Sequence, residues 1–463
     1  MFARRIQRAA LAGAFSFLTG HACSAPAQAS ASPSVCEAAS AVPLLRLSTA
    51  LTLFDACSPT LIQADAQLAA AHADQISNGH APNPVLGLGV SNINPQAGTG
   101  GGALRDRTVD SAVRIDQLIE RGGKRGARRA AAAANSDAAQ LLRDDAIQRG
   151  HQSVLEAYAG LSAAMTEAAL LRADADSYQT GLQAMRQRLG AGDVALADVN
   201  RAALDAARAA ADADAAELSV LQARATLSTT LGIGPLPDAT RLEPLETLTG
   251  PVREAAGAGD TVSAYEDRPD LRASAARLGA AQASLSLADA GRKRDVDLTL
   301  GFDHWPTSPT NTQGTGNSYT VGISLPLFLY DSGRGGQLHA RADVRTAQSD
   351  LDSRRASAER ELVTARQQAS QAQVLAERYR TALLPAAEQI LQAEELAYQR
   401  GAAGLLDLLD ARRSQRQVAV AALAAQRDAL TAAGRLELAR GRDPLRMLPT
   451  PDLPVAATPE TSP

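Results

Sequence analysis

Aromatic residues are scarce in this chain of 463 residues, where phenylalanine, tryptophan and tyrosine together make up 3%. Such a composition, combined with abundant alanine, leucine, arginine and glutamine, favours long helices over the core of a globular enzyme. An excess of either charge is also missing, because 46 lysines and arginines stand against 50 aspartates and glutamates. A formal net charge of −4 gives no reason to expect nucleic acid as a partner.

Sequence signatures of catalysis and metal binding are missing as well. There is no nucleophile elbow, no HExxH motif and no glycine-rich fingerprint between a strand and a helix. The histidines beyond residue 30 are scattered, and none pairs with another histidine or with a cysteine at helical spacing. We therefore expect no enzyme, no cofactor and no dedicated transition-metal site.

Residues 1–29 have the features of a secretory signal peptide. Arg4, Arg5 and Arg8 form a basic start, an apolar run follows over 9–18, and Ala-Gln-Ala over 27–29 is a small-x-small cleavage site. Cys23 raises the alternative of a lipoprotein signal, although the residue three positions before it is glycine rather than an aliphatic residue. The sequence leaves lipidation of Cys23 open.

Few cysteines remain after such a cleavage. Cys36 and Cys57 do not have the spacing of metal ligands. Outside the cytoplasm they could form a disulfide, but two free thiols are equally compatible with the sequence.

The mature chain contains two copies of one unit. Gly192–Val199 aligns with Gly401–Leu408 at an offset of 209 residues, and Val113–Ile115 aligns with Val321–Ile323 at an offset of 208. Several matches at nearly one offset indicate a tandem duplication of roughly 210 residues. The expected organisation is an N-terminal extension over 30–50, a first repeat over 51–231, an irregular segment over 232–262, a second repeat over 263–441 and a proline-rich tail over 442–463.

Each repeat predicts the same order of elements: a helix, two strands, a very long helix, a glycine turn and a return helix. In the first repeat we expect the first helix over 51–80, the strands over 84–93 and 108–119, the long helix over 126–190 and the return helix over 195–231. In the second repeat the same elements are expected over 267–293, 295–304 and 318–329, 336–400 and 405–440. A helix of about 65 residues spans roughly 97 Å, so it must pack as a coiled coil or similar bundle. Pro385 predicts a break or kink just before it.

The four strands alternate apolar and polar residues, and they have the length of transmembrane barrel strands. Four strands are too few to close a barrel, whereas three chains would supply twelve. Aromatic residues cluster around the second strand pair and would suit a membrane-interface girdle: Phe302, Trp305, Tyr319, Phe328 and Tyr330. The alternative is that these residues cap a sheet inside a soluble domain.

The repeated order of elements resembles the TolC family of outer-membrane channels over nearly the whole mature chain. The segments Gln117–Arg125, Ile323–Phe328 and Asp331–Gly335 are similar to the strand exits of its CzcC-like, heavy-metal branch. The resemblance implies an α+β membrane protein: a homotrimer with a 12-stranded β-barrel in the outer membrane of a Gram-negative bacterium, continued by an α-helical coiled-coil barrel in the periplasm. It also implies an inner-membrane RND pump, a periplasmic adaptor and outer-membrane lipid as partners.

The same resemblance implies roles for the hairpin tips. The turns dock the adaptor, through Gly192, Asp193 and Val194 in the first repeat and Gly401, Gly404 and Leu405 in the second. The residues that close the periplasmic gate and line the lumen are Asp198, Tyr398, Asp407 and Asp410. One departure is Ala403, which occupies a position where the best-known member has an arginine, so a link through that arginine must be absent or replaced by Arg400 or Arg412.

Several alternatives remain open at the level of sequence. Asp407 and Asp410 share a helix face, which fits either a lumen ring that attracts cations or an ordinary solvated surface. The cargo is either heavy-metal cations, or drugs and other small molecules, or a protein secreted by a type I system. A different class of function is a periplasmic coiled-coil adaptor or scaffold without a pore.

Overall fold

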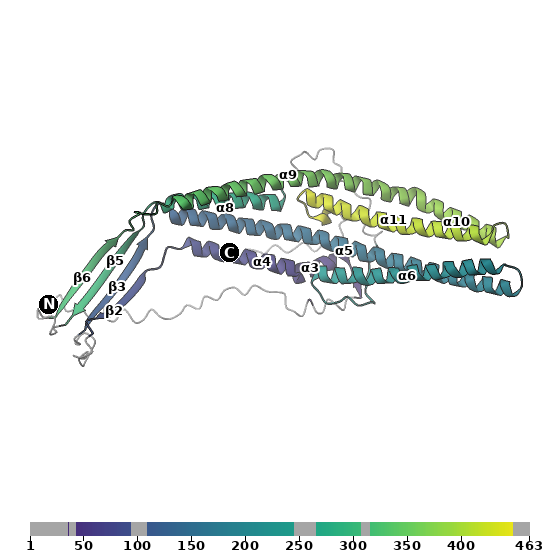
Figure 1. Ribbon diagram of the computed structural model, residues 1–463, viewed down its shortest axis with the longest axis horizontal. Coiled ribbons are helices and arrows are strands. Elements are labelled where there is room, and N and C mark those ends of the chain that lie inside the picture. Colours follow the sequence, from purple (N-terminus) through teal and green to yellow (C-terminus); the bar gives the residue numbers. More distant parts are fainter. Residues whose placement is uncertain (1–35, 37–42, 94–108, 245–264, 307–314, 448–463) are drawn as a thin grey trace, which may run out of the picture.

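The chain is elongated, with a β-sheet at one end and two helical hairpin tips at the other (Figure 1). The computed structural model describes Cys36 and residues 43–93, 109–244, 265–306 and 315–447. The expected signal peptide, most of the N-terminal extension, the second part of the irregular segment and most of the tail lie outside the described residues.

Both repeats follow the same order of elements. The first comprises α3 (Leu47–Cys57), α4 (Pro59–Gly79), β2 (Val85–Ser91), β3 (Asp110–Ile119), α5 (Lys124–Gly190) and α6 (Leu196–Leu231). The second comprises α8 (Pro269–Gly291), β5 (Val296–Trp305), β6 (Gly316–Ser324), α9 (Arg334–Arg378), a π-helical turn (Tyr379–Leu383), α10 (Leu384–Gln399) and α11 (Leu405–Ala439).

The first helix differs from the expected single helix over 51–80, because it is divided in two. Ser58 has extended backbone angles, φ −64° and ψ 124°, and Pro59 begins the next helix. Proline has no N–H to donate to the preceding turn, but it fits the first turn of a new helix. α3 therefore ends at Cys57, and α4 begins at Pro59, with only Ser58 between them.

The four strands form one antiparallel sheet in the order β2-β3-β5-β6, so the two repeats join through β3 and β5. The register places apolar residues of all four strands in common rows, one of which is Leu86, Ile115, Leu300 and Val321, and the next Leu88, Val113, Phe302 and Tyr319. A neighbouring row on the other face is Gly87, Arg114, Gly301 and Thr320. The sheet is therefore apolar on one face and mainly polar or glycine on the other.

The last strand is shorter than the expected 318–329. β6 ends at Ser324, two residues before Pro326, which cannot donate a hydrogen bond to a neighbouring strand. Phe328 and Tyr330 consequently lie beyond the sheet, in the connection to α9, and not on a strand.

The long helices pair as coiled coils toward the hairpin tips. On α6 the buried residues recur at alternating spacings of three and four, and so do those on α5: Val199, Ala202, Ala206, Ala209, Ala213 and Ala216 face Leu171, Ala175, Tyr178, Leu182 and Met185. This heptad pattern, with alanine along one helix, lets the two helices pack closely. α5 has 67 residues, and one stretch of it is apolar enough to cross a membrane by length and composition, yet it packs along α4, α6 and α8.

The break expected before Pro385 takes the form of a π-helical turn. The turn covers Tyr379–Leu383, and α10 begins directly after it with Pro385 in its first turn. Proline has no N–H to donate to the preceding turn, and its ring clashes with that turn. The extra residue of a π-turn makes room for the ring, so the helix continues. The descending arm of the second repeat therefore reaches its tip as α9 and α10 (Figure 1).

The most buried core lies midway along the bundle, where the chain's N-terminal part meets the first hairpin. Tyr158 is fully buried, and its hydroxyl donates to the carbonyl of Leu45 at 2.9 Å and accepts from the N–H of Glu243 at 3.0 Å. A disulfide joins Cys36 to Cys57, which resolves the choice that the sequence leaves open. These contacts fix α3 on the side of α5.

Candidate functional site at the hairpin tips

The two hairpin tips have equivalent turns. Gly192 and Gly401 adopt positive φ values of 82° and 73°, which L-residues with a side chain rarely adopt. After each glycine a backbone N–H returns to the preceding helix, from Asp193 to Arg188 at 2.9 Å and from Ala402 to Ala397 at 2.8 Å. These bonds satisfy the last carbonyls of each descending helix, so the glycines are required by the turn itself.

Asp407 contributes to the second tip as a helix cap. Its carboxylate accepts a hydrogen bond from the backbone N–H of Gly404 at 3.0 Å. Gly404 directly precedes Leu405, the first residue of α11, so the carboxylate satisfies an N–H that the helix cannot. The side chain of Asp407 remains exposed to solvent.

The other proposed gate residues make weak contacts on the surface of the single chain. Asp198 lies 3.9 Å from Arg201 on its own helix, and the hydroxyl of Tyr398 lies 3.4 Å from Arg188. Asp410 lies 3.3 Å from Arg413, with its side chain 75% exposed. Exposed pairs of this kind contribute little to stability.

A row of arginines on α11 joins the second hairpin to the first, about two to three turns from the start of that helix. Arg412 donates to the hydroxyl of Ser177 on α5 at 2.6 Å. Arg413 reaches Asp205 on α6 at 3.3 Å. Arg416 reaches Asp174 on α5 at 3.0 Å. We call Arg412, Arg413 and Arg416 the arginine clasp.

One arginine of the clasp, Arg412, is also one of the two residues expected to replace the arginine that is absent at position 403. Ala403 carries no polar side chain, whereas Arg412 also lies 3.2 Å from Glu395 on α10 and therefore contacts both hairpins. Of the two replacements expected from the sequence, Arg412 is the one that bridges between the hairpins in the described residues. Arg400 serves as the C-cap of α10.

The aromatic residues expected at the membrane interface lie in two places. Phe302 and Tyr319 face each other across β5 and β6 with ring centroids 5.4 Å apart, and Trp305 ends β5. Phe328 lies beyond the sheet under the guanidinium of Arg294, 5.7 Å from the ring centroid, and Tyr330 is fully exposed. The set therefore divides between the sheet and its exit toward the helices.

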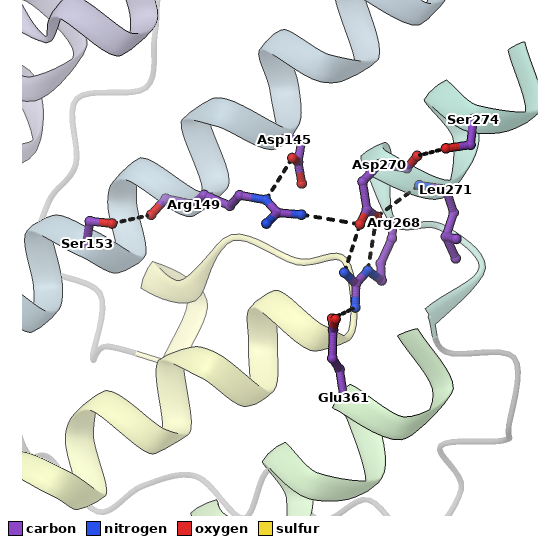
Figure 2. Close-up of polar contacts among 8 residues, drawn as sticks. All are labelled: Asp145, Arg149, Ser153, Arg268, Asp270, Leu271, Ser274 and Glu361. Carbon is purple, nitrogen blue, oxygen red and sulfur yellow. Dashed lines mark hydrogen bonds and ion pairs between the residues drawn. The ribbon is translucent and has the colours of Figure 1, made fainter. Parts of the chain in front are cut away.

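The structure adds a polar network that sequence analysis missed, built around the buried side chains of Arg268 and Asp270 where α8 begins (Figure 2). Arg268 donates to the carboxylate of Asp270 at 2.9 and 3.0 Å and to Glu361 on α9 at 2.7 Å. Arg149 on α5 also reaches Asp270, at 3.3 Å, and donates to Asp145 at 2.7 Å. The network therefore joins α5, α8 and α9.

Two carboxylates of this network have shifted pKa values of opposite sign. Burial raises the pKa of Asp270, but the hydrogen bonds from Arg268, the positive charges of Arg268 and Arg149 and the N–H of Leu271 together outweigh it, and the net pKa is lowered. Burial raises the pKa of Asp145, and its bond to Arg149 offsets this only in part. The local signal in the sequence is Arg-Pro-Asp over 268–270, with proline opening a helix, but the partners lie about 90 to 120 residues away.

Metal binding within one chain finds no support in the described residues, where no group of three or more His, Cys, Asp or Glu side chains is placed to hold an ion. Asp198 lies on α6, whereas Asp407 and Asp410 both lie on α11, and each of the three makes its own contact.

Two repeats of a β-hairpin followed by a long helical hairpin, with an apolar sheet face, define the class of outer-membrane channel subunits. The chain belongs to the outer membrane efflux protein family, whose model matches residues 53–233 and 262–442. The protein accordingly resides in the outer membrane and extends into the periplasm, and the family assignment decides against a scaffold without a pore.

Individual relatives agree with this assignment. The chain is 27% identical over 349 residues to the cobalt-zinc-cadmium resistance protein CzcC of Cupriavidus metallidurans, covering 75% of this chain and 81% of the relative. It has the fold of the MtrE outer membrane channel of Neisseria gonorrhoeae, with TM-score 0.71, 22% identity and coverage of 86% of this chain and 89% of that one. For the outer membrane protein VceC of Vibrio cholerae the TM-score is 0.68, with 22% identity and coverage of 86% and 96%.

Proposed function

We propose that three copies of this chain form a 12-stranded barrel and a continuous helical tunnel that carries heavy-metal cations out of the cell. The observation that carries the proposal is the sheet. In the described residues, β2 and β6 each pair on one side only, and the apolar rows cross all four strands in register. Exposed sheet edges inside a bilayer are too costly, so the edges must pair with other copies.

The tunnel would be passive, with the choice of cargo made by the pump. An inner-membrane RND pump and a periplasmic adaptor would deliver the cation, and the adaptor would dock on the tips at Gly192–Val194 and Gly401–Leu405. The support for a metal cargo is the sequence relation to CzcC, a cobalt-zinc-cadmium resistance protein. Drug efflux and type I secretion are the competing cargo assignments.

The gate would lie where the tips of three chains meet. Asp198, Tyr398, Asp407 and Asp410 are exposed or weakly paired in one chain, which suits residues that meet symmetry-related copies or passing cations. Rings of carboxylates around an axis attract cations. The arginine clasp would set the distance between the hairpins of each chain and thereby the width of the gate.

The test is a deletion strain exposed to cobalt, zinc, cadmium and copper salts and, in parallel, to a panel of drugs. The expected result is a lower tolerance of metal salts that is restored by the plasmid-borne gene, with unchanged tolerance of drugs. Sensitivity to drugs alone would overturn the metal assignment. Loss of a secreted protein with normal tolerance of both would point to secretion instead.

A further inference from the structure

Three segments of the chain meet where the sheet passes into the helices. They are 120–129, which joins β3 to α5 and includes the first turns of α5, 291–296 from the end of α8 to the start of β5, and 325–334 from the end of β6 to the start of α9 (Figure 1). The N–H of Arg121 donates to Asp295 at 2.9 Å, and the ammonium of Lys124 lies 2.7 Å from the same carboxylate. The guanidinium of Arg294 lies over the ring of Phe328, so the third segment also contacts the second and the three form one surface at this junction.

This junction carries a concentration of exposed cations. We define the junction collar as Arg121, Arg125, Arg129, Arg292, Lys293, Arg294 and Arg334, all of which are exposed. The neighbouring acids are already engaged, because Glu120 pairs with Arg128, Asp295 with Lys124, and Asp331 accepts the N–H of Gly333. The collar therefore projects a net positive charge into solvent.

Three cations of the collar lack an anionic partner among the described residues. No carboxylate in the described residues forms an ion pair with Arg129, Arg292 or Arg334. α5 and α9 both begin here, and neither has an acidic residue in its first turn. Since helix N-termini favour negative charge, basic residues there add to an unfavourable local potential unless an outside anion compensates.

Exposed apolar side chains lie directly beside these cations. Leu327 is 66% exposed, Leu329 is 75% exposed and Tyr330 is fully exposed. Phe328, between them, lies under the guanidinium of Arg294. Apolar and basic side chains mixed at one level suit the boundary between hydrocarbon and lipid headgroups, where aromatic residues and long cationic side chains concentrate.

The apolar face of the sheet continues into this boundary. Ile119 at the end of β3 and Ile323 near the end of β6 are both exposed on the single chain. The collar begins at Arg121, two residues beyond Ile119. The cations therefore lie just past the lipid-facing strands, on the periplasmic side of the membrane.

We propose that the junction collar binds the phosphate groups of anionic phospholipids in the periplasmic leaflet of the outer membrane, while Leu327, Leu329 and Tyr330 enter the edge of the hydrocarbon. Phospholipid phosphate is the anion that a barrel protein meets at this level, and basic clusters beside a membrane attract acidic lipids. The inference rests on residence in the outer membrane and is independent of the cargo and of the gate.

The experiment uses the full-length purified oligomer in detergent, titrated with phosphatidylglycerol or phosphatidylethanolamine and observed by native mass spectrometry. The wild type is expected to retain phosphatidylglycerol preferentially, and the preference should fall as the salt concentration rises. The variant Arg292→Gln/Lys293→Gln/Arg334→Gln should lose at least about tenfold of this preference, since each cation near anionic lipid contributes roughly fivefold.

Two further variants separate charge from folding. Arg292→Lys/Arg334→Lys keeps the charge and should keep the preference. Arg201→Gln/Arg208→Gln removes exposed cations near the hairpin tip and should have no effect. Oligomer size and heat-modifiability on gels report whether each variant folds.

Three results would overturn the proposal. The first is an unchanged lipid preference in a folded triple variant. The second is an equal loss in the tip control. The third is altered ion selectivity in bilayer recordings with unchanged lipid preference, which would place the collar in the lumen. Metal tolerance of the strain reports separately on the proposed cargo.

Discussion

Arg416 of α11 lies 3.0 Å from the carboxylate of Asp174 on α5, and the two side chains are only 17% and 16% exposed. The pair joins the second hairpin of the chain to the first. A charge-assisted hydrogen bond with this degree of burial is stronger than an exposed ion pair. The contact is therefore a structural restraint on how far the hairpins can separate.

Removing this restraint should open the tunnel. We expect Arg416→Ala to raise single-channel conductance in planar bilayers, because the bond to Asp174, on the order of 1.5–3 kcal/mol, no longer holds the hairpins together. The matched control is Arg427→Ala, which loses only a contact to Asp428 on its own helix. The exchange variant Arg416→Asp/Asp174→Arg keeps an ion pair between the two helices and should conduct like the wild type. Wild-type conductance in Arg416→Ala would contradict a role in gating.

We expect the charges of Asp407 and Asp410 to set cation preference, and the side chain of Asp407 also to stabilise the start of α11. Asp407→Asn/Asp410→Asn keeps an oxygen acceptor for the N–H of Gly404 but removes both charges, so the tip should stay folded while cation preference falls. Bilayer recordings with asymmetric salt and with added divalent cations measure this change. Asp407→Ala should in addition destabilise the start of α11 by about 1 kcal/mol. Unchanged selectivity and cation block would exclude a lumen ring.

We expect the proposed docking of the adaptor on the tips to tolerate a substitution at Gly192 or Gly401 if the new residue can adopt a positive φ. The positions of a Cβ at Gly192 and Gly401 meet no other atoms, so strain in the backbone is the main local cost of a substitution. Asn enters the left-handed region more easily than Val. We expect Gly192→Val and Gly401→Val to abolish efflux with oligomers intact, and Gly→Asn to retain more of it. Full metal tolerance in the Val variants would place docking elsewhere.

His151 should make stability depend on pH. Its ring nitrogens lie 3.1 Å from Asp55 and 2.9 Å from Asp443, and the ring is nearly buried. Burial lowers its pKa, but the hydrogen bonds that the ring donates to Asp443 and Asp55, with the negative charges of both, outweigh this and raise the pKa from 6.5 to about 9. The charged form is thus favoured in the folded chain, which ties α3 and the C-terminal segment to α5.

The sign follows from the raised value. The stabilisation is fully present below pH 6.5 and is lost as the pH rises through about 9, amounting to at most about 3 kcal/mol. Solvent screening of the half-exposed Asp55 reduces this amount. We expect the unfolding temperature of the wild type, measured by circular dichroism, to fall between pH 6.5 and about 9. The unfolding temperature of His151→Gln should depend less on pH. The same pH dependence in both proteins would refute a charged His151 bound to Asp55 and Asp443.

Local patterns predicted the elements well wherever the cause was local. The alternation of apolar and polar residues indicated β2, β3 and β5 to within a few residues, and the glycine turns at 192 and 401 ended the long helices as expected. Errors arose at prolines. Pro59 divided the first helix, and Pro326 followed a strand that ended sooner than its apolar pattern.

The candidate site was less accessible to sequence reasoning. Its turns were visible as repeated glycines, but Asp407 is a helix cap as well as an exposed charge. The arginine clasp connects residues more than 200 positions apart, and its partners on α5 and α6 carry no motif. Contacts over such separations depend on how helices lie against one another and have no local signature.

By itself, the sequence determined the duplication, the order of elements and the amphipathic sheet, because these follow from residue spacing along the chain. Only the tertiary structure decided the Cys36–Cys57 disulfide, the buried network around Arg268 and the clasp from Arg416 to Asp174. The physical reason is that ion pairs and disulfides form between groups brought within a few ångströms by packing. One helical pattern is compatible with several different pairings of charged residues and cysteines. The packing of the helices decides which of these pairings forms.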